Sequence, residues 1–214
     1  MNIKSQKSIS LIIAFIYLVG IILHMIPATR FKVLSLSSLM LLASDLLILY
    51  FLWREHLNLR FIFICLMLFC FTMLSEISGV HTGFPFGKYL YGEVLGPKIF
   101  GVPWIIGLNW TVLILGTYSL TERVKLPQFY ALLVPASLMI LLDLVMEPVA
   151  TRLSYWSWIG GKIPYSNYLS WFIISLIFTA VLRIAGIRLN EKLAGNYYVI
   201  CFGFFVILLV YNII

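Results

Sequence analysis

The stretch Glu76–Trp104 reads EISGVHTGFPFGKYLYGEVLGPKIFGVPW and differs from the apolar sequence on both sides of it. It is dense in Gly, Pro, Tyr and ionisable residues. A connection of about 20 residues is long for a compact helical protein, and such connections are usually functional or disordered. Disordered segments are poor in aromatic residues, whereas this one is rich in them. We therefore expect an ordered, functional loop at residues 79–100.

The composition around this loop indicates a membrane protein. Of the 214 residues, 62% are hydrophobic and 11% are charged, whereas a soluble domain carries about 25% charged residues. Apolar segments approach or reach the length of about 20 residues that a transmembrane helix needs. Seven such spans are expected, at residues 9–26, 33–53, 57–78, 101–120, 127–149, 168–185 and 196–214. We predict an all-α, polytopic bundle that forms one transmembrane domain over residues 1–214, with the fifth span kinked at Pro135.

The charged residues suit a membrane protein better than a nucleic-acid-binding one. The net charge of +7 is explained by Lys and Arg in short loops between the spans, where they set the orientation of the protein and contact anionic lipid. No nucleic-acid-binding motif is present. The first span follows two lysines but has no small-residue cleavage site, so we expect it to be retained. Loop cations number nine on the amino-terminal side (Lys4, Lys7, Arg54, Arg60, Arg123, Lys125, Arg183, Arg188, Lys192) and six on the other. This favours a cytoplasmic amino terminus in the inner cell membrane.

The cysteines predict neither a disulfide framework nor structural zinc. Cys65, Cys70 and Cys201 all lie inside apolar runs without CxxC spacing. We expect buried free thiols that act as small hydrophobic side chains.

The direction of the spans brings the unusual loops together. Spans three and five run the same way, so the loops 79–100 and 150–167 lie at one face of the membrane, with the start of span two. Both loops are rich in aromatic residues. These predict either an interfacial aromatic belt or a cap over a cavity for a long apolar ligand, with aromatic faces that stabilise cations.

Asp143 and Glu147 form the second feature of interest. Their i, i+4 spacing in the fifth span places them on one helix face, among apolar neighbours. Two acids this close in a low-dielectric setting do not both ionise cheaply, so at least one is expected to keep its proton and serve as a general acid. Ionisable residues inside spans usually mark functional sites. The alternative places Glu147 at the helix end, in headgroup water, paired with Arg152.

Other ionisable residues leave alternatives open. Glu76 is either a third carboxylate facing the same cavity, with His81 as proton carrier or hydrogen-bond partner, or an interfacial residue satisfied by loop amides. Carboxylates and imidazole suit iron or manganese, but neither HExxH nor ExxH occurs, so we expect no metal. Asp45, near the middle of span two, either lines the bundle interior beside the acids or pairs with Asn109 or Arg183 as a structural contact.

At these residues the chain resembles the membrane-embedded carotenoid biosynthesis proteins of the carotenoid 1',2'-hydratase and bisanhydrobacterioruberin hydratase type. The matching blocks are GFPFGKYLY at 83–91, GVP at 101–103, NW at 109–110, DLVMEP at 143–148, WSW at 156–158, IPYSNY at 163–168 and Trp171. They cover about residues 70–175. Relatives often have Tyr in place of Phe86, and some have Asp in place of Glu147.

The resemblance implies addition of water to the terminal 1',2' double bond of an acyclic carotenoid end. Lycopene, a monocyclic γ-carotene type or a C50 carotenoid would be the substrate. Hydrating such an alkene needs a proton donor, brief stabilisation of a tertiary cation, and a delivered water. A buried acid supplies the first need, and aromatic faces with a second carboxylate supply the second. No cofactor is expected.

We therefore predict Asp143 as proton donor and Glu147 as its coupled partner, with Glu76 and His81 orienting the water. The residues expected to line or cap the substrate pocket are Tyr89, Tyr91, Asn109, Trp110, Tyr165, Asn167 and Trp171. The expected partners are the lipid bilayer, a carotenoid and other enzymes of carotenoid biosynthesis.

Two alternatives remain at this point. A carotenoid cyclase shares the protonation step but adds no water. A proton-linked transporter also uses membrane carboxylates, although no inverted repeat is visible and the polar groups gather at one face.

Overall fold

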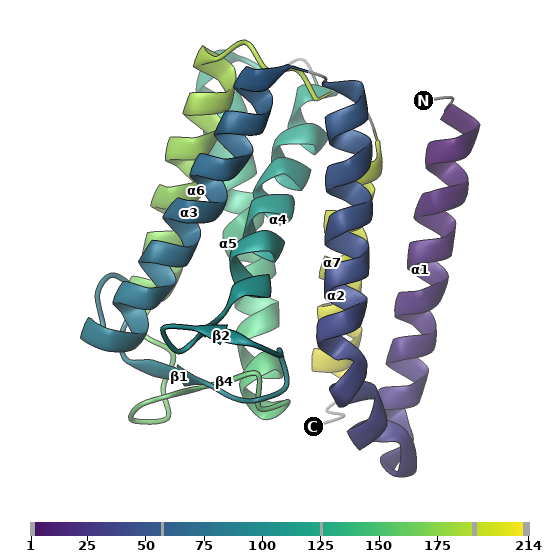
Figure 1. Ribbon diagram of the computed structural model, residues 1–214, viewed down its shortest axis with the longest axis vertical. Helices are drawn as coiled ribbons and strands as arrows, with labels where there is room; N and C mark the ends of the chain where they lie inside the picture. Colours follow the sequence, from purple (N-terminus) through teal and green to yellow (C-terminus); the bar gives the residue numbers. More distant parts are fainter. Residues whose placement is uncertain (1–2, 57, 125, 190–191, 212–214) are drawn as a thin grey trace.

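A computed structural model describes residues 3–56, 58–124, 126–189 and 192–211. Over these ranges it contains seven helices, each long and apolar enough to cross a membrane, which confirms the predicted polytopic all-α fold (Figure 1). The helices are α1 (Ile3–Met25), α2 (Pro27–Glu55), α3 (Leu59–Thr82), α4 (Trp104–Glu122), α5 (Gln128–Arg152), α6 (Tyr165–Ile184) and α7 (Leu193–Val210). Lys125, counted for orientation, and residues 212–214 of the expected last span lie outside the described ranges.

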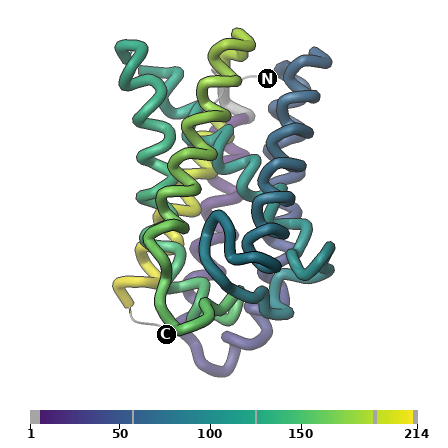
Figure 2. The backbone as a smooth tube through the Cα atoms, turned by 90° about the vertical axis from the view of Figure 1, so that its left-hand side faces the viewer, coloured from purple at the N-terminus to yellow at the C-terminus, as the bar shows by residue number. Residues whose placement is uncertain are grey.

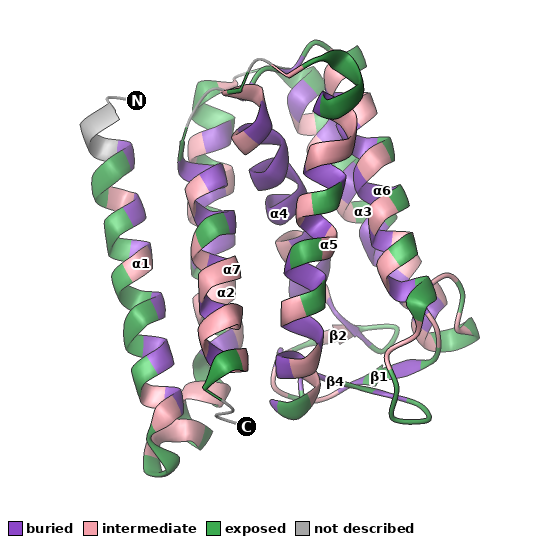
Figure 3. Cartoon of the chain, turned by 180° about the vertical axis from the view of Figure 1, so that it is seen from behind, coloured by how far each residue is buried: buried purple, intermediate pink, exposed green. Residues whose placement is uncertain are grey.

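The central element is α4, which is buried nearly all round. It packs against α2, α3, α5 and α7, and 83% of its apolar stretch is buried inside the protein. Helix α1 packs mainly on α2 and α7, and many of its residues are exposed (Figure 3). An exposed apolar helix face is what a bilayer solvates, so the burial pattern agrees with a membrane bundle built around α4.

The helices α3 and α5 continue further than the sequence indicates. Residues 79–82 and 150–152, expected to be loop, form the last turns of these helices. Gly79 lies within α3 and does not end it. The glycine allows Tyr89 to pack closely against the helix, because a Cβ at this position would lie 2.8 Å from the Tyr89 hydroxyl. The helix ends instead at Gly83, whose φ of 81° makes it the left-handed cap. Helix α5 runs through Pro135 and Pro148 without a break in its assignment.

The two long connections carry short strands that the sequence analysis did not predict. Strand β1 (Tyr89–Tyr91) pairs antiparallel with β4 (Trp156–Trp158), while β2 (Lys98–Ile99) pairs with β3 (Val102–Pro103). Both connections meet at the end of the bundle opposite the start of α1, as the common direction of α3 and α5 predicts (Figures 1 and 2). The β1–β4 pair, called here the β1–β4 ribbon, lies across that end.

The cysteines are free, as expected, but not all are buried. Cys201 is buried, Cys65 is half-buried and Cys70 is exposed on the outer surface of α3. An apolar run therefore does not by itself indicate burial inside the protein, because in a membrane the outer helix faces are apolar too.

Candidate active site

Three carboxyl groups lie buried beneath the β1–β4 ribbon. Glu76 on α3 is 3% exposed, and Asp143 and Glu147 on α5 are 0% and 3% exposed. We call these three residues the carboxyl cluster. The two glutamates lie in the last two turns of their helices, and Asp143 lies one turn deeper on the face of α5 that Glu147 shares.

Glu76 accepts hydrogen bonds from three side chains. The hydroxyls of Tyr89 and Tyr91 donate to its Oε2, the latter over 2.7 Å. The indole of Trp110 donates to its Oε1 over 3.1 Å. Tyr89 and Tyr91 come from β1 and Trp110 comes from α4, so Glu76 is satisfied by aromatic side chains and not by loop amides.

Glu147 also accepts three hydrogen bonds. The indoles of Trp156 and Trp158 donate to its Oε2 over 2.9 and 2.7 Å. The amide of Asn167 donates to its Oε1 over 3.2 Å. Arg152, the expected alternative partner, is exposed, so Glu147 faces the bundle interior and not the headgroup water.

Asp143 is less well supplied with donors. Its Oδ2 accepts from the Asn167 amide over 2.7 Å, so one amide joins Asp143 to Glu147. No group among the described residues bonds Oδ1 of Asp143, although that atom is buried. Asp143 also lies close enough to Glu147 and Glu76 for their charges to act on it.

The ribbon's alternation explains how four donors reach the cluster. Successive side chains of a strand point to opposite faces, so Tyr89 and Tyr91 face inward while Leu90 is exposed. The opposite strand follows the same pattern, and its register sets Trp158 beside Tyr89 and Trp156 beside Tyr91. Burial, followed by the charge of Glu76, raises the pKa of both tyrosines well above the ordinary value. Both therefore stay protonated and able to donate.

A stack of aromatic rings closes the side of the site. Trp171 on α6 lies face to face with Trp110, with centroids 3.7 Å apart, and with Phe86, at 4.9 Å. All three rings are buried. The carboxyl cluster is thus surrounded by aromatic faces and neutral donors.

Most of the predicted site residues converge here, but His81, Tyr165 and Asn109 do not. Within the described ranges, Tyr89, Tyr91, Trp110, Asn167 and Trp171 all contact the cluster or its ring stack, as reported above. His81 is exposed, and its Nε2 lies 3.1 Å from the Phe100 carbonyl. Tyr165 is 91% exposed. Neither side chain reaches the cluster.

Asp45 lies inside the bundle near Tyr17, Tyr197 and Cys201, and no interaction with the carboxyl cluster is found among the described residues. It is 0% exposed and pairs with neither expected partner. Asn109 instead accepts a hydrogen bond from Tyr197 over 3.4 Å, and Arg183 lies 2.8 Å from Glu122.

The sequence analysis missed Trp156, Trp158 and Phe86 as site residues. The two tryptophans were read as a general aromatic cap or belt. The signal that identifies them is the alternation in Trp-Ser-Trp, matched by Tyr-Leu-Tyr at 89–91, because period two is typical of a strand with one buried face.

The donors that fill the carboxylate oxygens also bear on metal binding. No group of three His, Cys, Asp or Glu side chains in the described part of the chain is arranged to hold a metal ion. Hydrogen bonds from Tyr, Trp and Asn already occupy the oxygens of Glu76 and Glu147.

Comparison with known proteins now adds to this geometry. The family described as carotenoid biosynthesis protein matches residues 35–214. The chain belongs to this family. A curated relative, the bisanhydrobacterioruberin hydratase of Haloarcula japonica, is 32% identical over 107 residues.

The region aligned with this hydratase covers 46% of the present chain and 36% of the relative, so the match spans little more than a third of that protein's length. No solved structure matches the chain. Membership of the family and seven apolar helices together identify a multi-pass membrane protein of carotenoid biosynthesis.

Proposed function

We propose that this protein is a carotenoid hydratase that adds water to the terminal 1',2' double bond of an acyclic carotenoid end. The observation that carries the proposal is the buried carboxyl cluster, in which Asp143 has a free oxygen and two neighbouring carboxylates that are each held by three donors. The hydratase name of the Haloarcula relative supports the same chemistry.

The distribution of donors supports Asp143 as the residue that carries the proton. Hydrogen bonds donated to a carboxylate favour its charged form, and Glu76 and Glu147 each receive three. Asp143 receives one and lies beside both of the others. A third negative charge in this space is unfavourable, so Asp143 is the carboxyl suited to carry and donate a proton.

The reaction balances without a redox partner. The π electrons of the alkene form a new C–H bond with the Asp143 proton, which leaves a cation at the tertiary carbon. A water oxygen forms the C–O bond, and the extra proton of the resulting oxonium returns to the carboxyl cluster. Each turnover consumes one water and regenerates the acid.

The aromatic surroundings suit the intermediate. Ring faces attract cations, and Trp110, Trp171 and Phe86 form a continuous stack beside Glu76. The two ionised glutamates add electrostatic stabilisation where positive charge develops. The site thus offers a donor on one carboxyl and cation stabilisation from its neighbours.

An apolar groove next to the site suits a long hydrocarbon substrate. It lies between α3 and α6, has a volume of about 700 Å³, and is lined by Leu74, Phe84 and Ile173 among others. Two groove residues, Ser75 and Ser170, directly precede Glu76 and Trp171 in the chain. A polyene lying in this groove places its end near the ring stack.

The test is production of this protein in a bacterium that makes acyclic carotenoids, followed by mass spectrometry of the pigments. Hydration adds the mass of one water, whereas cyclisation leaves the mass unchanged. Asp143→Asn should abolish the product while the protein still accumulates in membranes. His81→Ala, which changes an ionisable residue outside the cluster, serves as the matched control and should retain turnover. An expressed wild-type protein that hydrates neither acyclic nor monocyclic carotenoids contradicts the proposal.

A further inference from the structure

A small cavity borders the indoles that hold the two glutamates. Trp110 and Trp156, whose N–H groups donate to Glu76 and Glu147, also line a space of about 40 Å³. A water needs about 10–15 Å³ of such space and two to four polar partners. The cavity is therefore the size of a few waters and much smaller than the groove between α3 and α6.

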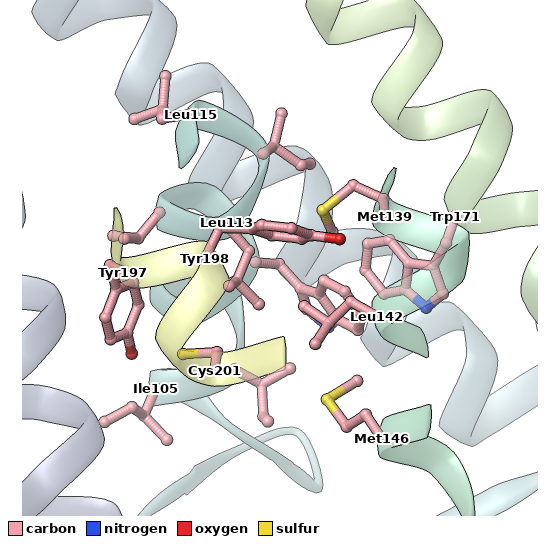
Figure 4. Close-up of a cluster of buried hydrophobic side chains, with 14 of the residues drawn as sticks. Ile105, Leu113, Leu115, Met139, Leu142, Met146, Trp171, Tyr197, Tyr198 and Cys201 are labelled. Carbon is pink, nitrogen blue, oxygen red and sulfur yellow. The ribbon is translucent and has the colours of Figure 1, made fainter. Parts of the chain in front are cut away.

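Polar groups are present in the cavity wall. Tyr17 on α1, Asn109 on α4 and Cys201 on α7 line it together. The hydroxyl of Tyr17 lies 3.1 Å from that of Tyr197, which in turn donates to Asn109 over 3.4 Å. Figure 4 shows Tyr197 and Cys201 on one side of the buried apolar side chains and Trp171 on the other. Most of the cavity lining is apolar, so the polar side chains in its wall are the groups that a water there can meet.

Asp45 is a further buried polar group in this region. It is completely buried, and neither carboxyl oxygen has a hydrogen bond of ordinary geometry from the described residues, although the Tyr197 hydroxyl lies near enough to interact with the carboxyl. Its carboxyl nevertheless lies close enough to Tyr17, Tyr197 and Cys201 to interact with them electrostatically. Buried polar groups almost always have partners, and ordered water is the usual one when protein groups are not available.

A second, larger pocket lies between this region and the membrane surface. A wider polar vestibule of about 660 Å³ lies at the ribbon end of the bundle, with Arg30 and Arg152 in its wall. Three residues line the cavity while their chain neighbours line the vestibule, namely Ser37, Leu95 and Tyr155 for the cavity and Ser38, Val94 and Ser154 for the vestibule. One layer of residues separates the two spaces.

Side-chain contacts across that layer include one hydroxyl pair and one apolar side chain. The Tyr155 hydroxyl donates to the Ser37 hydroxyl over 3.0 Å, and Leu95 is 1% exposed. A hydroxyl pair of this kind exchanges readily with water, because each hydroxyl is both donor and acceptor.

We propose that this cavity binds the water that is added to the carotenoid, and that the water enters from the vestibule through the layer formed by Ser37, Leu95 and Tyr155. The inference rests on the proposed hydratase function and adds a second entrance to it. The hydrocarbon arrives from the lipid between α3 and α6, and the water arrives from the membrane surface on the other side of α4. Asp45 acts as a positioning residue behind Tyr17 and Tyr197.

Turnover in D₂O separates protonation of the alkene from capture of the cation. A cation that water fails to capture loses a proton and returns to an alkene, so the recovered carotenoid gains deuterium. Asn109→Leu and Asp45→Asn should lower the hydrated product by roughly 100-fold, the cost of misplacing a reacting group by about 1 Å. Both variants should still incorporate deuterium, whereas Asp143→Asn should lose hydration and deuterium together.

The matched control is Tyr198→Phe, which removes a buried α7 hydroxyl that bonds the Leu138 carbonyl instead of lining the cavity. It should hydrate like the wild type. If folded Asn109→Leu hydrates normally, or if it loses hydration and deuterium in equal proportion, the water-site proposal is overturned.

Labelling of Cys201 tests the cavity without any turnover. In a protein with Cys65→Ser and Cys70→Ser, a small water-soluble thiol reagent should modify Cys201, and Leu95→Ala should accelerate the modification by about tenfold or more by opening the wall. If wild-type protein makes no hydrated carotenoid but Cys201 labels in this way, the hydratase function fails while the water route stands. If Leu95→Ala leaves the labelling rate unchanged, the route is wrong whatever the reaction.

Discussion

Buried glutamates at the two ends of the bundle meet different partners. At the end away from the ribbon, the Glu122 side chain is 4% exposed and lies 2.8 Å from Arg183 and 3.1 Å from Arg188. At the ribbon end, Glu76 and Glu147 are bonded only by hydroxyl, indole and amide groups within the described residues. A cation cancels the charge of its partner, whereas neutral donors stabilise the charge of a carboxylate without cancelling it. The same residue type is thus ion-paired at one end and keeps an uncompensated negative charge at the other.

The largest effect should come from converting the ribbon end to the ion-paired type. Asn167→Lys places an ammonium between Asp143 and Glu147, which favours the ionised form of both acids. Without a proton to donate, hydration should fall by roughly 10²–10⁴-fold, the contribution of a positioned general acid. Pigment mass spectrometry measures it.

Asn167→Ala is the matched control, because it removes the same hydrogen bonds without adding a charge. It should lose less activity than Asn167→Lys. Equal losses in the two variants, with both proteins present in the membrane, would show that charge is not the deciding factor.

Removing one neutral donor should have the next largest effect. Tyr91→Phe deletes the hydroxyl that donates to Glu76 over 2.7 Å, and a hydrogen bond to a charged group contributes roughly 1.5–3 kcal/mol. Hydration should drop by about 10- to 100-fold, measured as product per amount of membrane protein. Ser157→Ala on the exposed face of β4 should have no such effect, and a similar drop there would indicate general damage to the ribbon.

Gly79→Ala should shift the ribbon without removing any polar group. The new methyl would lie 2.8 Å from the Tyr89 hydroxyl and 2.9 Å from the Phe86 ring, so the tyrosine must move away from Glu76. A displacement of this size should lower hydration by about tenfold. Gly203→Ala is the control, because a Cβ there meets nothing within 4 Å. Equal hydration by the two variants would contradict the inference that Tyr89 must pack closely against Gly79.

The smallest effect on chemistry is expected from the opposite end. Glu122→Gln should destabilise the protein by roughly 1–3 kcal/mol, because Arg183 loses a charged partner while Arg188, 72% exposed, can turn to water. Hydration per folded protein should stay unchanged. Thermal inactivation in detergent and pigment analysis measure the two quantities separately, and a changed product would link Glu122 to the reaction.

The sequence predicted the helices and the meeting of the acids, but not what holds the acids. The spans follow from hydropathy, and the common direction of α3 and α5 brings Glu76 near Asp143 and Glu147. The donors escaped prediction because strands of three residues leave little periodic signal, and because tryptophans near a helix end resemble an interfacial belt.

His81 shows how one boundary changes a site. With α3 ending near Gly79, His81 would be free to fold back towards Glu76. The helix instead continues to Thr82, and residues five apart on a helix point about 140° away from each other. His81 therefore faces outward, away from the carboxyl cluster.

The position of the donors along the chain has a consequence for how this protein enters the membrane. Tyr89 and Tyr91 follow Glu76 by 13 and 15 residues, and Trp156 and Trp158 follow Glu147 by 9 and 11. For each glutamate, two of the side chains that donate hydrogen bonds to it thus lie in the segment synthesised shortly after it. Neither glutamate therefore depends entirely on a distant helix for hydrogen-bond donors while it is in the hydrocarbon of the membrane. Pairing of β1 with β4 then joins two segments in which the glutamates already have donors.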